Sequence, residues 1–376
     1  MAHQSDGERP AERPGGTGRR RGRRAWWMRT TAVALGLALL LAGGGLTALY
    51  LKLDGNIDHV DIDGALGPDR PANGPGGSLD ILVLGSDSRS GGNGAFGADD
   101  AQDGARADTA MVVHVNAAHD AATVVSIPRD TLVDRPSCER ADGSTAPARE
   151  RAMFNEAYTV GGPVCAVKTV ESVTGLRMDH YIEVDFQGFA ELIDTLGGVE
   201  VTTTRAIDDK DSHLRLPAGT HTLDGEQALA LVRTRKAVGD GSDLSRIALQ
   251  QAFLKALAGQ VGEVGPASNP KRLYDLADAA TSAVTTDSSL ASVTDLIALG
   301  RTLQGIGPGD MDLLTLPVGP DHADPNRVAP LPGESRQVWS ALRHDQPVPP
   351  SVGRGRAGEG DGVLAGDGTQ AGDGGE

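Results

Sequence analysis

A long uncharged segment near the N-terminus constrains the fold of this chain more than any other feature. Residues 32–51 (AVALGLALLLAGGGLTALYL) hold no charged side chain over 20 positions, about the length that a helix needs to cross the hydrocarbon core of a bilayer. Trp26 and Trp27 lie just before the segment, where amphipathic rings favour the headgroup region. The segment predicts an uncleaved transmembrane helix. The alternative is a cleaved signal peptide, although its apolar core is usually shorter.

Charge is distributed unevenly on the two sides of this segment. The first 30 residues contain eight arginines and three acidic residues, whereas the whole chain has a net charge of −16. Basic flanks stay in the cytoplasm, so we expect a single-pass protein of the cell membrane with a cytoplasmic N-terminus and an extracytoplasmic body. That body is acidic and only 3% of all residues are aromatic, so nucleic acid is disfavoured as a partner.

The cysteine count agrees with an exported body. Cys138 and Cys165 are the two cysteines of the chain, and an even pair in an oxidising compartment predicts a disulfide. Closing a loop of this length would stabilise the fold by about 3.5 kcal/mol in the chain-entropy model. Two unrelated buried thiols are the alternative.

Composition divides the chain into six parts. They are an Arg-rich disordered cytoplasmic segment (1–31), the transmembrane helix (32–51), a Pro/Gly-rich extracytoplasmic linker (52–78), the main domain (79–262), a C-terminal extension packed on it (263–343) and a disordered Gly/Asp-rich tail (344–376). Within the extension, TLPVG at 315–319 is typical of a returning strand.

Strand and helix patterns alternate in the main domain. Apolar runs rich in β-branched residues predict strands at 79–85, 109–116, 122–129, 180–185 and 199–204. Patterns of helical period predict helices at 155–174, 186–198, 223–235 and 243–261. We therefore expect an α/β fold with a mixed central β-sheet flanked by helices on both faces. His114 lies in an apolar strand, where a packed or edge residue is expected rather than a ligand.

Charged residues cluster where the predicted strands begin and end. Asp87 and Arg89 follow the first strand, Arg106 and Asp108 precede the second, and Arg129 and Asp130 end the third. A second set brackets a Gly-containing loop, namely Arg233, Arg235, Lys236 and Arg246. Two aspartates with several arginines suit a divalent metal and a phosphorylated ligand. Solvated salt bridges at loop edges are the alternative interpretation of the same pattern.

Four strings carry a resemblance to one known family. LDILVLGSDSR, ARADTAMVVHVN, VVSIPRDTLV and GEQALALVRTRK stand in order within residues 79–261, and together they resemble the LytR-CpsA-Psr family of cell-envelope proteins. The resemblance implies a phosphotransferase that moves a glycopolymer from a polyprenyl-pyrophosphate carrier onto peptidoglycan through a phosphodiester. The implied partners are the lipid-linked glycopolymer, peptidoglycan and membrane lipid. The polymer would be teichoic acid, arabinogalactan or a capsule-like polysaccharide.

The resemblance also implies roles for individual residues. Asp87 and Asp108 would hold Mg²⁺ or Mn²⁺, and Asp87, Arg129 and Arg233 would act in catalysis, with Asp87 as the candidate base. The pyrophosphate would be bound by six arginines, which are Arg89, Arg106, Arg129, Arg233, Arg235 and Arg246. One position departs from the family pattern, because Leu249 stands where a second arginine is common.

Two other functions fit the same residues. A hydrolase of lipid pyrophosphates would use water in place of the sugar hydroxyl, and only an assay of acceptor dependence separates it from a transferase. A non-catalytic envelope protein would bind polyprenyl phosphates without forming product. A transcriptional regulator conflicts with the expected extracytoplasmic body.

Overall fold

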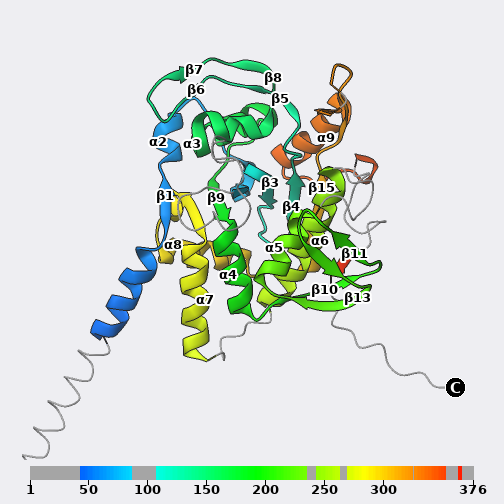
Figure 1. Cartoon of the computed structure of the whole chain (residues 1–376). Helices are drawn as coiled ribbons and strands as arrows, with labels where there is room; N and C mark the ends of the chain where they lie inside the picture. The colour runs from blue at the N-terminus through cyan, green and yellow to red at the C-terminus, as the bar shows by residue number, and fades with distance from the viewer. Residues whose placement is uncertain are drawn as a thin grey trace, which may run out of the picture. The chain divides into compact units, whose positions relative to one another are not determined.

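A mixed β-sheet forms the centre of the computed structural model (Figure 1). The structure describes residues 43–86, 107–234, 243–262, 269–324, 326–352 and 363–365. Contacts divide the chain into a short unit, residues 1–52, of which 43–52 are described and helical, and a large unit from residue 53 onward. No helix in the described ranges is long and apolar enough to cross a membrane. The predicted cytoplasmic segment (1–31) and residues 32–42 of the predicted transmembrane helix (32–51) lie outside the described residues.

Seven strands of the described residues form the central sheet, in the order β1-β14-β9-β2-β3-β4-β15. Their bounds are β1 Asp58–Val60, β2 Leu79–Ser86, β3 Ala107–Val115, β4 Ala122–Ser126, β9 His180–Asp185, β14 Val284–Asp287 and β15 Met311–Thr315. The pairs β1–β14, β9–β2 and β4–β15 are parallel, and the other neighbours are antiparallel. The sheet is therefore mixed, as the sequence predicts.

The two faces of the central strands differ in burial. Side chains alternate between the faces of a strand, and residues paired across β2, β3 and β9 point to the same face. One face carries fully buried side chains, including Leu82, Val112 and Tyr181. The opposite face, although also apolar, is only half-buried at five positions, which are Val83, Met111, Val113, Ile182 and Val184.

Helices α3 (Phe154–Thr174) and α9 (Pro332–Arg343) cover the fully buried face. Val167 and Val170 of α3 pack with Trp339 and Leu342 of α9 in the main hydrophobic cluster. The GGP break is confirmed, because Gly162 has φ of 60° inside α3. Four short strands form an arm beside α3, namely β5 (Leu132–Arg135), β6 (Cys138–Glu139), β7 (Thr145–Ala146) and β8 (Arg149–Met153). The Cys138–Cys165 disulfide joins this arm to α3, so the predicted disulfide is confirmed.

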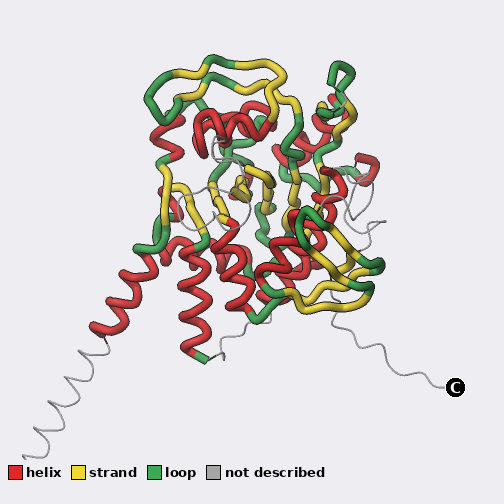
Figure 2. The backbone as a smooth tube through the Cα atoms, viewed as in Figure 1, coloured by secondary structure: helices red, strands yellow, loops and turns green. Residues whose placement is uncertain are grey.

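A second layer lies beyond the half-buried face. Three helices and four strands pack around a separate apolar cluster. The helices are α4 (Phe186–Leu196), α5 (Gly225–Arg233) and α6 (Asp243–Gly262), and the strands are β10 (Val199–Thr203), β11 (Ile207–Asp209), β12 (Leu214–Leu216) and β13 (Gly219–Leu223). Helix α6 reaches the sheet, because Gln250 and Gln251 bond to Thr109 of β3 and Ser126 of β4 on this face. The tube view shows the helical layers and the outlying strands (Figure 2).

The chain beyond residue 262 contributes to the central sheet. Helix α7 (Pro270–Ser282) leads into β14, and α8 (Val293–Leu303) leads into β15. The strand expected at 315–319 instead divides into β15, which ends at Thr315, and β16 (Val318–Pro320), which pairs with β17 (Val328–Pro330). The remaining α-helix is α2 (Ile62–Leu66), and the remaining strand is β18 (Val363–Ala365). β18 pairs with β10, although it lies within the tail that composition predicts to be disordered.

Candidate active site

Strand ends and one helix start bring Asp108, Arg129 and Arg246 together. Asp108 is the second residue of β3, Arg129 follows β4, and Arg246 lies in the first turns of α6. Arg129 donates from Nη1 to Asp108 Oδ1 at 2.8 Å, and Arg246 donates from Nη2 to the Asp108 carbonyl at 3.1 Å. Both guanidinium groups thus approach the same strand start from different elements. The Arg246 side chain is buried, and burying a cation is unfavourable without such partners.

A cavity of 210 Å³ adjoins this cluster. Its walls contain Arg233, Arg246 and Asp108, together with Thr109, Phe186, Asp211, Ser212, Val232 and Gln250. Arg233 is the last residue of α5, and its guanidinium lies 5.4 Å from the centre of the Phe186 ring. Stacking on an aromatic face orients the planar guanidinium group. The cavity therefore combines cations, carboxylates and hydroxyls in a small space.

Local sequence positions Arg233 at this wall. Asp224 and Gln227 form a capping box that begins α5, and the helix ends at Arg233 because Thr234 is extended with ψ of 134°. The sequence predicts that at least one of Arg233 and Arg235 leaves regular helix; Arg233 is the last helical residue of α5, and Arg235 lies outside the described residues. Gln250 then joins the end of α5 to the sheet, because its Nε2 donates at 3.0 Å to both the Val232 carbonyl and Thr109 Oγ1.

The structure brings together four of the eight residues predicted to bind metal or pyrophosphate. Asp108, Arg129, Arg233 and Arg246 lie in or beside the cavity. The other predicted residues lie outside the described residues, namely Asp87, Arg89, Arg106 and Arg235. β2 ends at Ser86 and β3 begins at Ala107.

Comparison with known proteins decides the family. Residues 49–341 match the model described as the LytR_cpsA_psr family. The chain belongs to the LytR-CpsA-Psr family. It is 33% identical over 306 residues to the cell wall biosynthesis protein LcpA of Corynebacterium glutamicum, a match that covers 75% of this chain and 58% of LcpA. The chain therefore spans less than two thirds of the length of that relative.

Two further comparisons concern a protein named as a transferase. The chain is 32% identical over 242 residues to TagT of Bacillus subtilis, a polyisoprenyl-teichoic acid–peptidoglycan teichoic acid transferase, over 61% of this chain and 69% of TagT. A solved structure of TagT bound to LIIa-WTA is 27% identical, with a TM-score of 0.56, and covers 76% of this chain and 99% of that one. The mixed sheet with helical layers is thus the LytR-CpsA-Psr fold.

The departure at Leu249 has a structural explanation in this LytR-CpsA-Psr protein. Leu249 is 1% exposed and packs in the second apolar cluster with Leu231 and Phe253. A charged side chain at that position would be buried among apolar groups at high energetic cost. Leucine at this position therefore stabilises the layer that carries Arg246.

Several cavity residues were not predicted from the sequence. Thr109, Phe186, Asp211, Ser212 and Gln250 all line the wall. Asp211 and Ser212 belong to the turn between β11 and β12, in a layer whose packing on the central sheet depends on long-range contacts. Gln250 had a local signal, since it lies four residues after Arg246 on one helix face.

The oxygen donors in the cavity suit a hard cation. Among the described residues no group of three or more His, Cys, Asp or Glu side chains could hold a metal ion by itself. The wall nevertheless offers the carboxylate of Asp108 and the hydroxyls of Thr109 and Ser212, and oxygen ligands are those that Mg²⁺ prefers. These residues fit a cation that is also held by phosphate oxygens.

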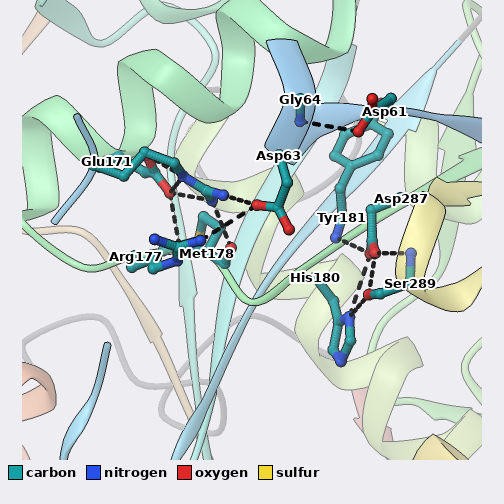
Figure 3. Close-up of polar contacts among 11 residues, drawn as sticks. Asp61, Asp63, Gly64, Glu171, Arg177, Met178, His180, Tyr181, Asp287 and Ser289 are labelled. Atoms are coloured by element: carbon teal, nitrogen blue, oxygen red, sulfur yellow. Dashed lines mark hydrogen bonds and ion pairs between the residues drawn. The ribbon is translucent and has the colours of Figure 1, made fainter. Parts of the chain in front are cut away.

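A second polar region, away from this cavity, serves the fold. Figure 3 shows contacts there around Glu171 and around Asp287, and the hydrogen bond from the Gly64 N–H to Asp61. Arg70 of the linker bonds to Glu171 with Nε at 3.0 Å, and both side chains are almost fully buried. The pair links the predicted linker to α3. Removing one partner would leave an uncompensated buried charge and strongly destabilise the fold.

His180, Asp287 and Ser289 resemble a catalytic triad in composition but not in geometry. The same ring nitrogen, Nδ1 of His180, lies 3.3 Å from Asp287 Oδ2 and 3.1 Å from Ser289 Oγ. A proton relay needs a different ring nitrogen for each partner. Burial raises the pKa of Asp287, but hydrogen bonds from His180 and Ser289 outweigh this effect and lower the pKa to about 2. The group therefore stabilises the start of β9.

Proposed function

We propose that this chain is a membrane-anchored phosphotransferase that moves a glycopolymer from a polyprenyl-pyrophosphate carrier onto peptidoglycan, forming a phosphodiester. The observation that carries the proposal is the convergence of Arg129, Arg233 and Arg246 with Asp108 at one small cavity. Several guanidinium groups bind the oxygens of a pyrophosphate bidentately. The name of TagT, which describes transfer of teichoic acid to peptidoglycan, supports the same reaction class.

The half-buried sheet face supports a lipid substrate. Val83, Met111 and Ile182 are apolar and incompletely covered although they lie on central strands. Thr109 and Ser126 share this face and bond to α6, so the face continues to the cavity that contains Arg233. Apolar surface of this kind gains about 25 cal/mol per Å² when a hydrocarbon chain covers it. The polyprenyl chain would lie there, with its pyrophosphate at the arginines.

In this proposal the protein positions the substrates and neutralises charge. The acceptor hydroxyl loses its proton to a general base, for which Asp87 is the candidate, and its oxygen forms a bond to the sugar-linked phosphorus. The bond from that phosphorus to the bridging oxygen breaks, and polyprenyl phosphate leaves. Arg129, Arg233 and Arg246 stabilise the charge on the phosphoryl oxygens. Asp108, together with Asp87, would hold Mg²⁺ or Mn²⁺, which supplies further charge neutralisation when bound.

The proposed location follows from the sequence. Residues 32–51 would anchor the chain in the cell membrane, with the Arg-rich N-terminus in the cytoplasm and the cavity outside it. The disulfide between Cys138 and Cys165 supports an oxidising compartment.

Arginine variants test the proposed site. Arg233→Ala and Arg129→Ala should each lower the rate of glycopolymer transfer by about 10²- to 10³-fold, since each removes charge stabilisation of the reacting phosphoryl group. The matched control is Arg215→Ala, because Arg215 is exposed and pairs with the exposed Asp208 at 3.3 Å on the β11–β12 hairpin. Transfer is measured with a synthetic polyprenyl-pyrophosphate saccharide and peptidoglycan fragments. Full transfer activity of Arg233→Ala would contradict the assignment of this cavity as the active site.

A further inference from the structure

Two helices of the large unit are bonded to the chain that directly follows the proposed membrane anchor. Asp54 Oδ1 accepts from the N–H of Val293 at 3.1 Å, at the start of α8. Asn56 Nδ2 donates to Asp278 Oδ1 at 2.8 Å and to Thr281 Oγ1 at 3.2 Å, both on α7. Helices α7 and α8 are therefore fixed to residues 54–56.

This attachment keeps both helices close to the bilayer surface in an anchored chain. The uncharged segment ends at Leu51, and the three residues from there to Asp54 span at most about 11 Å even when fully extended. Leu53 and Ile57 are buried in the large unit, so the chain at this point is part of the fold and not a flexible spacer. The bonded ends of α7 and α8 thus lie near the lipid headgroups.

Helix α8 exposes apolar side chains at this place. Six of its 11 residues are apolar, yet none of the 11 is buried. Ile297 is 50% exposed, and Leu273 near the start of α7 is 39% exposed. Helices with exposed apolar side chains of this size enter the boundary between headgroups and acyl chains when they lie on a membrane.

The exposed charges on the two helices have one sign. The exposed charged residues are all cations, namely Lys271, Arg272 and Arg301. The aspartates of these helices are all partly buried, and they are Asp275, Asp278 and Asp295. This surface differs from the rest of a chain whose net charge is −16. Cations next to exposed apolar side chains match the anionic headgroups of a membrane surface.

We propose that the exposed sides of α7 and α8 bind the membrane surface, with Leu273 and Ile297 in the interface and the three cations at anionic headgroups. The inference rests on the proposed function, because the membrane anchor and the lipid carrier both belong to it. The contact limits the orientations of the large unit relative to the bilayer that holds the carrier. It therefore favours transfer of the polyprenyl chain from the bilayer to the half-buried face of the sheet.

The first test measures the contact without using activity. Full-length Leu273→Cys and Ile297→Cys variants are labelled with bimane and placed in phosphatidylcholine–phosphatidylglycerol vesicles that contain nitroxide-labelled lipid. The two native cysteines do not react, because they form a disulfide. The matched control is Leu331→Cys, since Leu331 is also 39% exposed and precedes α9, far from α7 (Figure 1).

We expect the nitroxide lipid to quench the labels at residues 273 and 297 several-fold more than the label at residue 331. Quenching at either position equal to that of the control would overturn the proposal. If both labels are quenched but the wild-type chain transfers no glycopolymer, the membrane contact stands and the proposed function falls.

A second test connects the contact to transfer. The double variant Leu273→Glu/Ile297→Glu places two negative charges at the interface, so the KM for a long-chain polyprenyl-pyrophosphate saccharide in vesicles should rise by about tenfold. Its rate with a water-soluble short-chain analogue should stay within about twofold of wild type, and Leu331→Glu should match wild type with both substrates. An unchanged KM in vesicles, or an equal loss with both substrates, would overturn the role of the contact in transfer.

Discussion

His114 is held between two carboxylates that come from distant parts of the sequence. Its Nδ1 lies 2.8 Å from Asp80 Oδ1, and its Nε2 lies 3.1 Å from Asp345 Oδ1. Asp179 faces the same group, because its Oδ2 accepts from the Asp80 N–H at 2.8 Å. Burial lowers the pKa of His114, but the hydrogen bonds and charges of Asp80 and Asp345 outweigh burial and raise the pKa overall. The sequence-based expectation of a packed residue holds, and the residue also links β3 to the end of α9.

This arrangement predicts a pH dependence of stability. Because the folded pKa of His114 is raised above its unfolded value of about 6.5, the imidazolium stabilises the fold fully below that pH. The contribution is lost as the pH rises through the folded pKa. The difference in free energy of unfolding between wild type and His114→Gln, measured in urea at several pH values, should be largest near pH 5.5 and shrink toward pH 9. A difference that grows with pH would contradict the assignment.

At the site, the sequence predicted the position of residues that lie at strand ends. Asp108 and Arg129 border apolar runs that could only be buried strands, and the edge of a sheet brings such ends together. Asp211 could not be predicted, because its place on the cavity wall depends on how the β11–β12 hairpin packs in a second layer. No local pattern encodes that contact.

At the scale of elements, the close packing of α5 against α4 sets the position of Arg233. Gly225 begins α5, and a Cβ added there would stand 2.1 Å from the carbonyl oxygen of Ala190 in α4. Gly225→Ala should therefore push α5 away from α4, destabilise the fold by about 1–3 kcal/mol and reduce transfer. Thermal unfolding and the transfer assay measure both effects.

A matched glycine provides the control. Gly300 lies within α8, and a Cβ added there meets nothing within 4 Å. Gly300→Ala should keep full transfer and gain up to about 1 kcal/mol of stability from helix propensity. Equal effects of the two substitutions would show that the spacing of α5 and α4 does not matter.

Helices and strands with a long periodic sequence pattern were predictable, whereas strands with a short pattern were not. The strand 180–185 and the helix beginning at residue 186 match β9 and α4, because an apolar alternation is followed by an amphipathic pattern that ends at Gly197. β14 and β15 were missed as members of the central sheet. β14 reads VTTD, with one apolar residue, and its place between β1 and β9 is set by pairing across more than 100 residues of sequence.

At the scale of the molecule, the large unit depends on its C-terminal part. β14 lies between β1 and β9, β15 covers the edge of β4, and α9 contributes Trp339 and Leu342 to the main core. A chain that ends at residue 262 should therefore not fold cooperatively, whereas one that ends at residue 352 should. Near-ultraviolet circular dichroism and urea unfolding distinguish the two. A cooperative transition of the shorter chain at the midpoint of the longer one would show that 79–262 is an independent domain.

The central claim is that this LytR-CpsA-Psr protein joins a glycopolymer to peptidoglycan at the arginine-lined cavity. The direct measurement incubates the full chain in vesicles with a synthetic polyprenyl-pyrophosphate saccharide, Mg²⁺ and peptidoglycan fragments, and identifies products by mass spectrometry. The account predicts a saccharide linked through one phosphate to the fragment, with polyprenyl monophosphate as the second product, and loss of both in Arg233→Ala. Saccharide phosphate released equally without fragments would indicate a hydrolase, and bound but unchanged lipid a carrier; either result would contradict the account.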